Sequence, residues 1–223
     1  RLCRDWSSDV CSSDLLLLLA RRASISHLRA DGVQIELTPA SRHTPFHFVR
    51  PRPPHLPLSI SLDDLSVSQL TLSAPQLAGP LQITRLSLMA RLDNRSWTLR
   101  DLRAEGAGLR LAGHGDWEFY HGERVNASLD WHLALPQGTA LAGRADAAGD
   151  EKLIRLKTEL NAPFSLSANA ELQDLFRAPR WRGRLVFSRL DPARLHAGWP
   201  AAEARGELRI SGDPAATLLS GAG

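Results

Sequence analysis

Residues 125–135 read Val-Asn-Ala-Ser-Leu-Asp-Trp-His-Leu-Ala-Leu, with an apolar residue at every second position. A period of two is the period of a β-strand, because successive side chains of a strand point to opposite faces of the sheet. This stretch therefore predicts a strand with one apolar face and one polar face, as in an antiparallel sheet that exposes one face to solvent.

The same alternation recurs on both sides of this stretch, from about Leu58 to Ile210. Turn residues such as Asp93-Asn94 and Gly149-Asp150 separate the runs, and a spacing of about 8–12 residues is typical of all-β folds. We predict an all-β fold of about a dozen mostly antiparallel strands. The expected strands are 58–62, 65–73, 81–92, 97–105, 109–118, 124–135, 140–147, 152–160, 164–173, 181–189 and 203–211.

Other segments break the alternation. Residues 38–57 contain six prolines, which excludes a central strand, so we interpret them as an exposed loop. Asp31-Gly32 signals a hairpin or turn between two strands within residues 23–37. The segment Asp191-Pro-Ala-Arg-Leu195 has an N-cap aspartate followed by proline, which predicts one short helix near 191–197. We expect no closing strand at the end of the chain.

The first fifteen residues share no pattern with the rest and contain both cysteines, Cys3 and Cys11. They resemble the translated remnant of a sequencing adapter, so we interpret 1–15 as a non-native artefact. The run from Leu15 to Ala20 is too short to span a bilayer, which needs about 20 apolar residues. It is a truncated signal anchor or, as we favour, a first strand. The predicted organisation thus has three parts. Residues 1–15 are the non-native artefact, residues 16–57 form the N-terminal strands and the Pro-rich loop, and residues 58–220 form a truncated β body.

Composition and motifs argue against several classes of function. The formal net charge is only +3, and the arginines are spaced singly, so we expect no nucleic-acid partner. His43 and His47 are four residues apart but lack a third ligand, and Asp63-Asp64 would point to opposite faces of a strand. No Gly-x-Ser-x-Gly sequence occurs. We predict no catalytic residue, no metal site, no cofactor and no enzymatic activity.

An apolar face of this size needs a cover, because soluble proteins rarely expose contiguous apolar patches beyond a few hundred Å². The sheet can close as a sandwich or barrel, coil as a solenoid, or form an open groove that holds something apolar. Leu, Ile, Val and Ala dominate the face, which favours a smooth apolar lining. The residues expected to line such a groove are Leu58, Ile60, Leu62, Leu129, Trp131, Leu133, Ile154, Leu156, Phe164 and Leu166.

Several phrases of the sequence resemble the AsmA-like proteins, and among them the TamB (translocation and assembly module subunit) family. Two are Leu65-Ser-Val-Ser-Gln-Leu-Thr-Leu72 and Ile25-Ser-His-Leu-Arg-Ala-Asp-Gly-Val-Gln-Ile35. The most specific phrase begins at Trp181. It continues through Leu-Asp-Pro-Ala and Gly198-Trp-Pro200 and ends in a Gly-bounded strand at 206–212. The ordered series spans about residues 23–220.

The resemblance implies an elongated, curved, taco-like sheet with an apolar groove. It also implies a periplasmic location, with the full-length protein anchored in the inner membrane of a Gram-negative bacterium. The expected ligands are phospholipid acyl chains that pass between the inner and outer membranes. The expected partner is a TamA-like outer-membrane barrel of the Omp85 type, met through a C-terminal domain missing here. Two alternatives stay open: an assembly chaperone for outer-membrane strands, and an extracellular β-solenoid adhesin or binding module.

Overall fold

The structure is a computed structural model that describes residues 7–8, 21–36, 58–73, 79–119, 123–134, 139–194, 198–214 and 216–222. Strands account for 77% and helix for 1% of the described residues, so the predicted all-β fold is confirmed. The described residues fall into two compact units, the first ending at Phe119 and the second beginning at Glu123. The predicted loop at 38–57 and the Leu15–Ala20 run lie outside the described residues.

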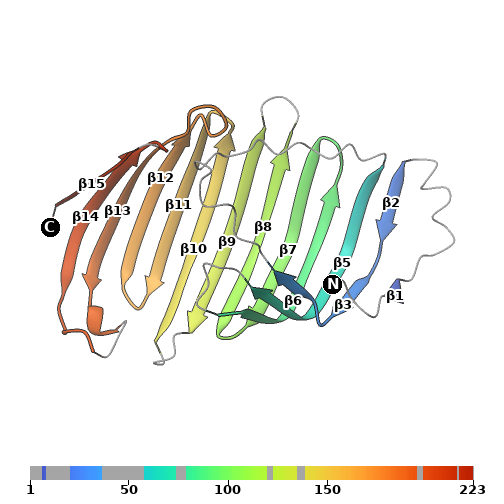
Figure 1. Ribbon diagram of the computed structural model, residues 1–223, viewed down its shortest axis with the longest axis horizontal. Helices are drawn as coiled ribbons and strands as arrows, with labels where there is room; N and C mark the ends of the chain where they lie inside the picture. The colour runs from blue at the N-terminus through green and yellow to red at the C-terminus, as the bar shows by residue number, and fades with distance from the viewer. Residues whose placement is uncertain are drawn as a thin grey trace. The chain divides into compact units, whose positions relative to one another are not determined.

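The first unit contains β1 to β8, and β5 to β8 run antiparallel in chain order (Figure 1). On the other side of β5, the strands β2, β3 and β4 follow one another and pair with it in parallel. The short β1 pairs with β3. The bounds are β1 Ser7–Ser8, β2 Arg22–Ile25, β3 Leu28–Asp31, β4 Gln34–Glu36, β5 Ser59–Ser73, β6 Leu81–Leu92, β7 Ser96–Gly106 and β8 Leu109–Glu118.

The second unit is an antiparallel meander in which each strand pairs with the next along the chain (Figure 1). The one helical element is a single 3₁₀ turn, η1, which confirms the short helix predicted near 191–197 in part of that range. The bounds are β9 Arg124–Ala134, β10 Ala140–Asp150, β11 Leu153–Ala162, β12 Ser165–Gln173, β13 Arg180–Leu190, η1 Pro192–Arg194, β14 Ala204–Gly212 and β15 Thr217–Ala222.

Three local predictions were wrong. The segments 58–62 and 65–73 form one strand, β5, because a bulge at Asp63-Asp64 carries the chain on without a turn. The Asp31-Gly32 signal does mark the break between β3 and β4, where Gly32 adopts a φ of 66°, but its hairpin alternative is wrong, because the chain continues alongside β5 in the same direction. A closing strand does exist, because β15 pairs with β14.

Bulges keep the apolar residues on one face where the strict alternation fails. Asp63 and Asp64 together lie opposite the single residue Met89, so Leu62 and Leu65, three apart, pair with residues on the same face of β6. A second bulge on β7 does the same for Leu99 and Leu102, with the neighbouring Asp101 at a φ of 47°. One extra residue on one strand shifts its side-chain phase by one position.

Each unit is a single layer of strands. Every extensive contact between described strands joins hydrogen-bonded neighbours, so within a unit no described element packs across the face of the sheet. Burial is correspondingly shallow, and no described side chain is completely shielded from solvent. The buried aliphatic and aromatic residues are Val67, Leu70, Ala104, Leu160 and Phe164.

Gly143 of β10 offers a test of this packing. A Cβ at this position would meet the backbone oxygen of Glu159 and come within 2.8 Å of the Trp131 ring. We expect Gly143→Ala to lower the free energy of unfolding by about 1–3 kcal/mol, because the backbone of β11 cannot move away freely. Urea unfolding followed by tryptophan fluorescence measures the change. Gly79→Ala is the control, since its Cβ would meet nothing within 4 Å; equal effects of both variants would contradict the expected clash.

Candidate functional site: the apolar faces of the two units

The strand registers of the second unit place apolar residues next to apolar residues from strand to strand. Leu129 of β9 pairs with Ala145 of β10, and Ala147 of β10 pairs with both Ala127 and Leu156. Paired residues lie on the same side of the sheet. The face continues over β12 to β14 through residue pairs such as Leu160 with Leu166, Leu166 with Phe187, and Leu185 with Leu208.

We call this surface the apolar face of the second unit. Thr158 of β11 and Thr217 of β15 are its polar positions. Its other members, taken from the registers, are Val125, Ala127, Leu129, Trp131, Leu133, Leu141, Gly143, Ala145, Ala147, Gly149, Ile154, Leu156, Leu160, Leu166, Ala168, Ala170, Leu172, Trp181, Gly183, Leu185, Phe187, Gly206, Leu208, Ile210, Gly212, Leu219 and Gly221.

The first unit has an apolar face of the same kind on β5 to β8. The pairs Ile60 with Leu92 and Leu62 with Ala90 lie on it. At one end of β7 and β8 an aromatic cluster adds large side chains: the Trp97 and Phe119 rings meet edge to face at 5.0 Å, and Trp117 lies 5.4 Å from Phe119. The aromatic residues that the structure describes in this unit, Trp97, Trp117 and Phe119, are thus concentrated at one place on the face.

The structure distributes the ten predicted lining residues between the two units. Ile60 and Leu62 lie on the apolar face of the first unit, and Leu58 is half-buried directly before β5. On the second unit the registers bring together six of the ten: Leu129, Trp131, Leu133, Ile154, Leu156 and Leu166. Phe164 is placed differently, in the turn between β11 and β12, where only 8% of it is exposed.

The prediction missed the small residues of the face, which form a line along β10. Gly143, Ala145, Ala147 and Gly149 occupy it, and all of their paired positions on β9 and β11 carry larger side chains except Ala127. Glycine and alanine contribute little to an alternation of apolar and polar residues. Only their pairing with residues of the neighbouring strands therefore identifies them as members of the apolar face. Leu141 continues the apolar face at one end of β10, and the Trp131 ring lies against Gly143.

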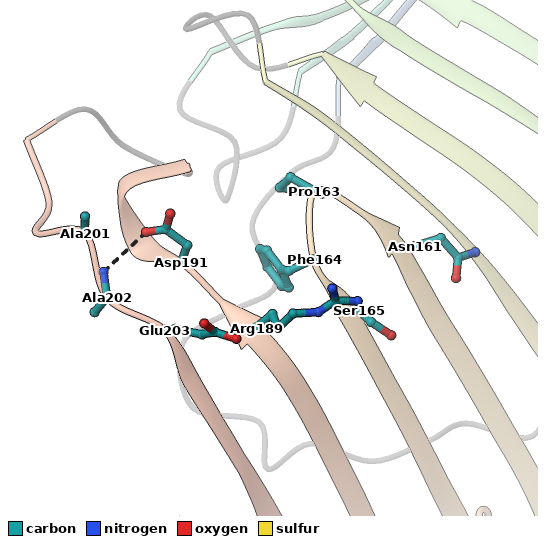
Figure 2. Close-up of a pocket in the computed structure, with 9 residues that line it drawn as sticks. All are labelled: Asn161, Pro163, Phe164, Ser165, Arg189, Asp191, Ala201, Ala202 and Glu203. Carbon is teal, nitrogen blue, oxygen red and sulfur yellow. Dashed lines mark hydrogen bonds between the residues drawn. The ribbon is translucent and has the colours of Figure 1, made fainter.

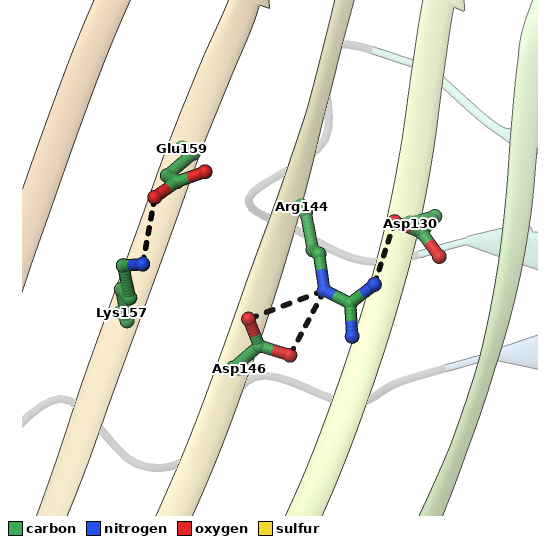
Figure 3. A network of polar contacts seen from close by, with 5 residues as sticks. All are labelled: Asp130, Arg144, Asp146, Lys157 and Glu159. Carbon is green, nitrogen blue, oxygen red and sulfur yellow. Dashed lines mark hydrogen bonds and ion pairs between the residues drawn. The ribbon is translucent and has the colours of Figure 1, made fainter.

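The opposite face of the second unit is polar, and ion pairs connect its charged side chains (Figure 3). Arg144 of β10 donates from Nε to Asp146 at 3.1 Å and lies 3.9 Å from Asp130 of β9, while Lys157 pairs with Glu159 on β11 at 2.8 Å. A hydrogen bond from Ser128, followed by the neighbouring Arg144, lowers the pKa of Asp146. These charges keep one side of the sheet hydrated, which fixes the other side as the apolar one.

Arginine and glutamate form a second network on β12 to β14. Arg182 pairs with Glu171 at 2.5 Å, and Glu207 accepts from Arg184 at 2.5 Å and from Arg209 at 2.6 Å. The hydrogen bond from Arg184, followed by that from Arg209, lowers the pKa of the Glu207 carboxyl below its ordinary value of 4.5. The carboxylate therefore stays charged and joins two strands of the sheet.

A cavity of about 560 Å³ lies at one end of β11 to β14 (Figure 2). Phe164 and Arg189 line it together with the loop before β14, where the Ala202 amide donates to Asp191 Oδ1 at 3.4 Å. The Ala193 amide donates to the same oxygen at 3.1 Å, which is the N-cap expected from the Asp191-Pro192 sequence. The lining is mixed in character and contains no set of groups arranged for acid–base or nucleophilic catalysis.

The described part of the chain holds no group of three or more His, Cys, Asp or Glu side chains placed to bind a metal ion. His43 and His47 lie outside the described residues. Asp64 of the carboxylate pair sits in the β5 bulge and contacts His27 Nδ1 at 3.2 Å. Among the described residues, no helix has the length and apolar character needed to cross a bilayer.

The Glu207 network predicts a pH dependence that can be measured directly. Because the pKa of Glu207 is lowered in the folded protein, its stabilising contribution is present above about pH 4.5 and is lost as the pH falls through the lowered pKa. An NMR titration of the carboxyl should show this pKa, and Arg184→Gln with Arg209→Gln should raise it toward 4.5. Arg124→Gln, on β9, should leave the pKa of Glu207 unchanged. If the double substitution also left this pKa unchanged, Arg184 and Arg209 would not be the cause of its lowering.

Comparison of the chain with protein-family models, with curated proteins and with solved structures gives no match.

Proposed function

We propose that the apolar faces bind phospholipid acyl chains, and that the chain is part of a periplasmic, inner-membrane-anchored protein that transports phospholipid between the inner and outer membranes. The observation that carries this proposal is the register of the second unit, in which apolar positions adjoin one another from β9 to β15. The resemblance to AsmA-like proteins supports the same function.

The chemistry of the face suits an acyl chain. Most of its members are aliphatic or small, with the three aromatic residues Trp131, Trp181 and Phe187 and few polar interruptions, so it offers contact area with little hydrogen-bonding specificity. Burial of methylene groups stabilises a complex by about 0.8 kcal/mol each, so a chain of about 16 carbons gains on the order of 10 kcal/mol before the entropic cost of binding. Ala145 and Ala147 of β10 add small apolar groups at the centre of the face, next to Leu129 and Leu156.

The polar face supports the assignment of the binding side. Ion pairs such as Arg144 with Asp146 keep that face in water, and a bound acyl chain there would strip charged groups of their hydration. The apolar face carries no such cost, and covering it removes exposed apolar surface from water. A lipid therefore binds the face that gains most from being covered.

A second function, assembly of outer-membrane proteins with a TamA-like barrel partner, is favoured by the edge of the second unit. β15 pairs with β14 on one side only within the described residues, and its Leu218 and Leu219 are 72% and 69% exposed. An edge strand with free backbone groups can accept an incoming strand by β-augmentation. This function is compatible with lipid binding, because it uses the edge of the sheet rather than its face.

The lipid-binding proposal is tested by placing a charge on the apolar face. We expect Leu156→Asp or Leu129→Asp to reduce the phospholipid that co-purifies with the protein by more than about tenfold, because a buried carboxylate disfavours acyl contact. Native mass spectrometry of the purified protein measures the bound lipid. Ala147→Trp is a second variant that keeps the face apolar but fills the line of small side chains, and it should also reduce bound lipid.

Asn169→Asp is the matched control. Asn169 is exposed on the polar face and pairs with Lys157, so the substitution adds the same charge on the opposite side of the sheet. Circular dichroism establishes that each variant retains its strands. Folded Leu156→Asp and Ala147→Trp variants that carry as much phospholipid as the unmodified protein would overturn the proposal.

The assembly function is tested with a photo-crosslinking amino acid at Leu219, in the presence of an unfolded outer-membrane β-barrel protein. We expect crosslinks to that polypeptide, because an added strand would lie against β15. Asn169, exposed on β12, which pairs with β11 on one side and β13 on the other, is the control position and should give none. Crosslinks to lipid alone at Leu219 would count against strand addition.

A further inference from the structure

Charge is distributed unevenly along the polar face of the second unit. On β9 and β10 the three carboxylates Asp130, Asp146 and Asp150 outnumber the two guanidinium groups Arg124 and Arg144. At the other end the balance reverses, because β13 and β14 present five arginines on this face against two glutamates, one of them on the neighbouring β12. We call four of these arginines the arginine row: Arg180, Arg182, Arg184 and Arg209; the fifth is Arg205 of β14.

The geometry of the sheet holds the arginine row together. Arg180, Arg182 and Arg184 alternate along β13, so their Cα atoms are about 7 Å apart. Arg209 of β14 pairs directly with Arg184, a placement of like charges that is destabilising by itself. Glu207 offsets this repulsion by accepting from both guanidinium groups. The sheet therefore keeps several positive charges at fixed, short spacing.

The two glutamates do not exhaust the hydrogen-bonding capacity of the row. A guanidinium group has five N–H donors, and each ion pair with Glu171 or Glu207 engages only some of them. The side chains of Arg182, Arg184 and Arg209 are 67%, 59% and 69% exposed, so the remaining donors face solvent.

A hollow of about 440 Å³ opens over the same strands. Arg182, Arg184 and Arg209 line it with Glu171, the ion-pair partner of Arg182, and with Asn169, Ser211 and Ser220, whose amide and hydroxyl groups can donate hydrogen bonds. Planar guanidinium groups bind phosphate in a bidentate manner, and hydroxyl and amide donors complement the remaining oxygens.

We propose that the arginine row binds the phosphate groups of anionic lipid headgroups at a membrane surface. The row extends along β13 and across to β14, so it can meet more than one phosphate of a surface at once, whereas a soluble phosphate would engage one position. Each arginine near an anionic membrane strengthens the attraction, and the effects accumulate along the row. The site lies on the opposite side of the sheet from the apolar face, so it does not depend on acyl-chain binding.

Co-sedimentation with vesicles tests this proposal on the whole chain. The protein should bind vesicles of equimolar phosphatidylcholine and phosphatidylglycerol and bind vesicles of phosphatidylcholine alone much more weakly. We expect Arg182→Gln with Arg209→Gln to lower the partition coefficient by at least about tenfold, at about fivefold per arginine. Glu171→Gln with Glu207→Gln should raise it, because two negative charges leave the row.

Arg124→Gln with Arg144→Gln is the matched control, since it removes the same net charge from the acidic end of the polar face and should change binding less than about twofold. Equal losses in the two double variants would overturn the proposal, as would equal binding to both kinds of vesicle. A third arm adds inorganic phosphate or chloride at matched ionic strength. Release by phosphate but not by chloride would assign the row to a soluble phosphate and overturn the membrane-surface proposal.

Discussion

The cross-strand register is the constraint on which the rest of this structure depends. Backbone hydrogen bonds fix which residue of one strand lies opposite which residue of the next, and opposed residues share a face. A slip of one position on β11, for example, would place Arg155 and Lys157 beside the alanines of β10 and move Leu156 into the polar face. A slip by an odd number of positions would separate the apolar side chains, so side-chain packing and backbone pairing stabilise the same arrangement.

Bulges extend this constraint over strands whose sequence does not alternate perfectly. The bulge at Arg189, which has a φ of 52°, lets Phe187 and Leu190 pair in turn with Gly206 and Ala204 of β14. Without the extra residue, the three-residue spacing would direct the second side chain of each such pair to the polar face. The irregular positions of these strands thus preserve the face that the regular positions create.

Alternation in the sequence was sufficient to predict the all-β fold and most strands, because a period of two is a local property. Six of the ten predicted lining residues share the apolar face of the second unit for the same reason. Bulges were harder to predict: Asp101 adopts a positive φ without being glycine, and only the spacing of Leu99 and Leu102 hints at it. The parallel pairing of β2 to β4 with β5 was not predictable, because it joins segments on opposite sides of the Pro-rich residues 38–57.

The two faces of the second unit impose a geometric separation on any ligand. A phospholipid whose acyl chains lie on the apolar face cannot place its phosphate in the arginine row, because the sheet itself lies between them. The headgroup of such a lipid must therefore remain at a strand end or project into solvent, where the cavity beside Phe164 and Arg189 offers mixed surroundings. The charges of the arginine row are then available to a different set of phosphates. Under the two proposals, one sheet would bind acyl chains on one side while the other side faces an anionic surface, and we expect each activity to be lost by substitution without the other.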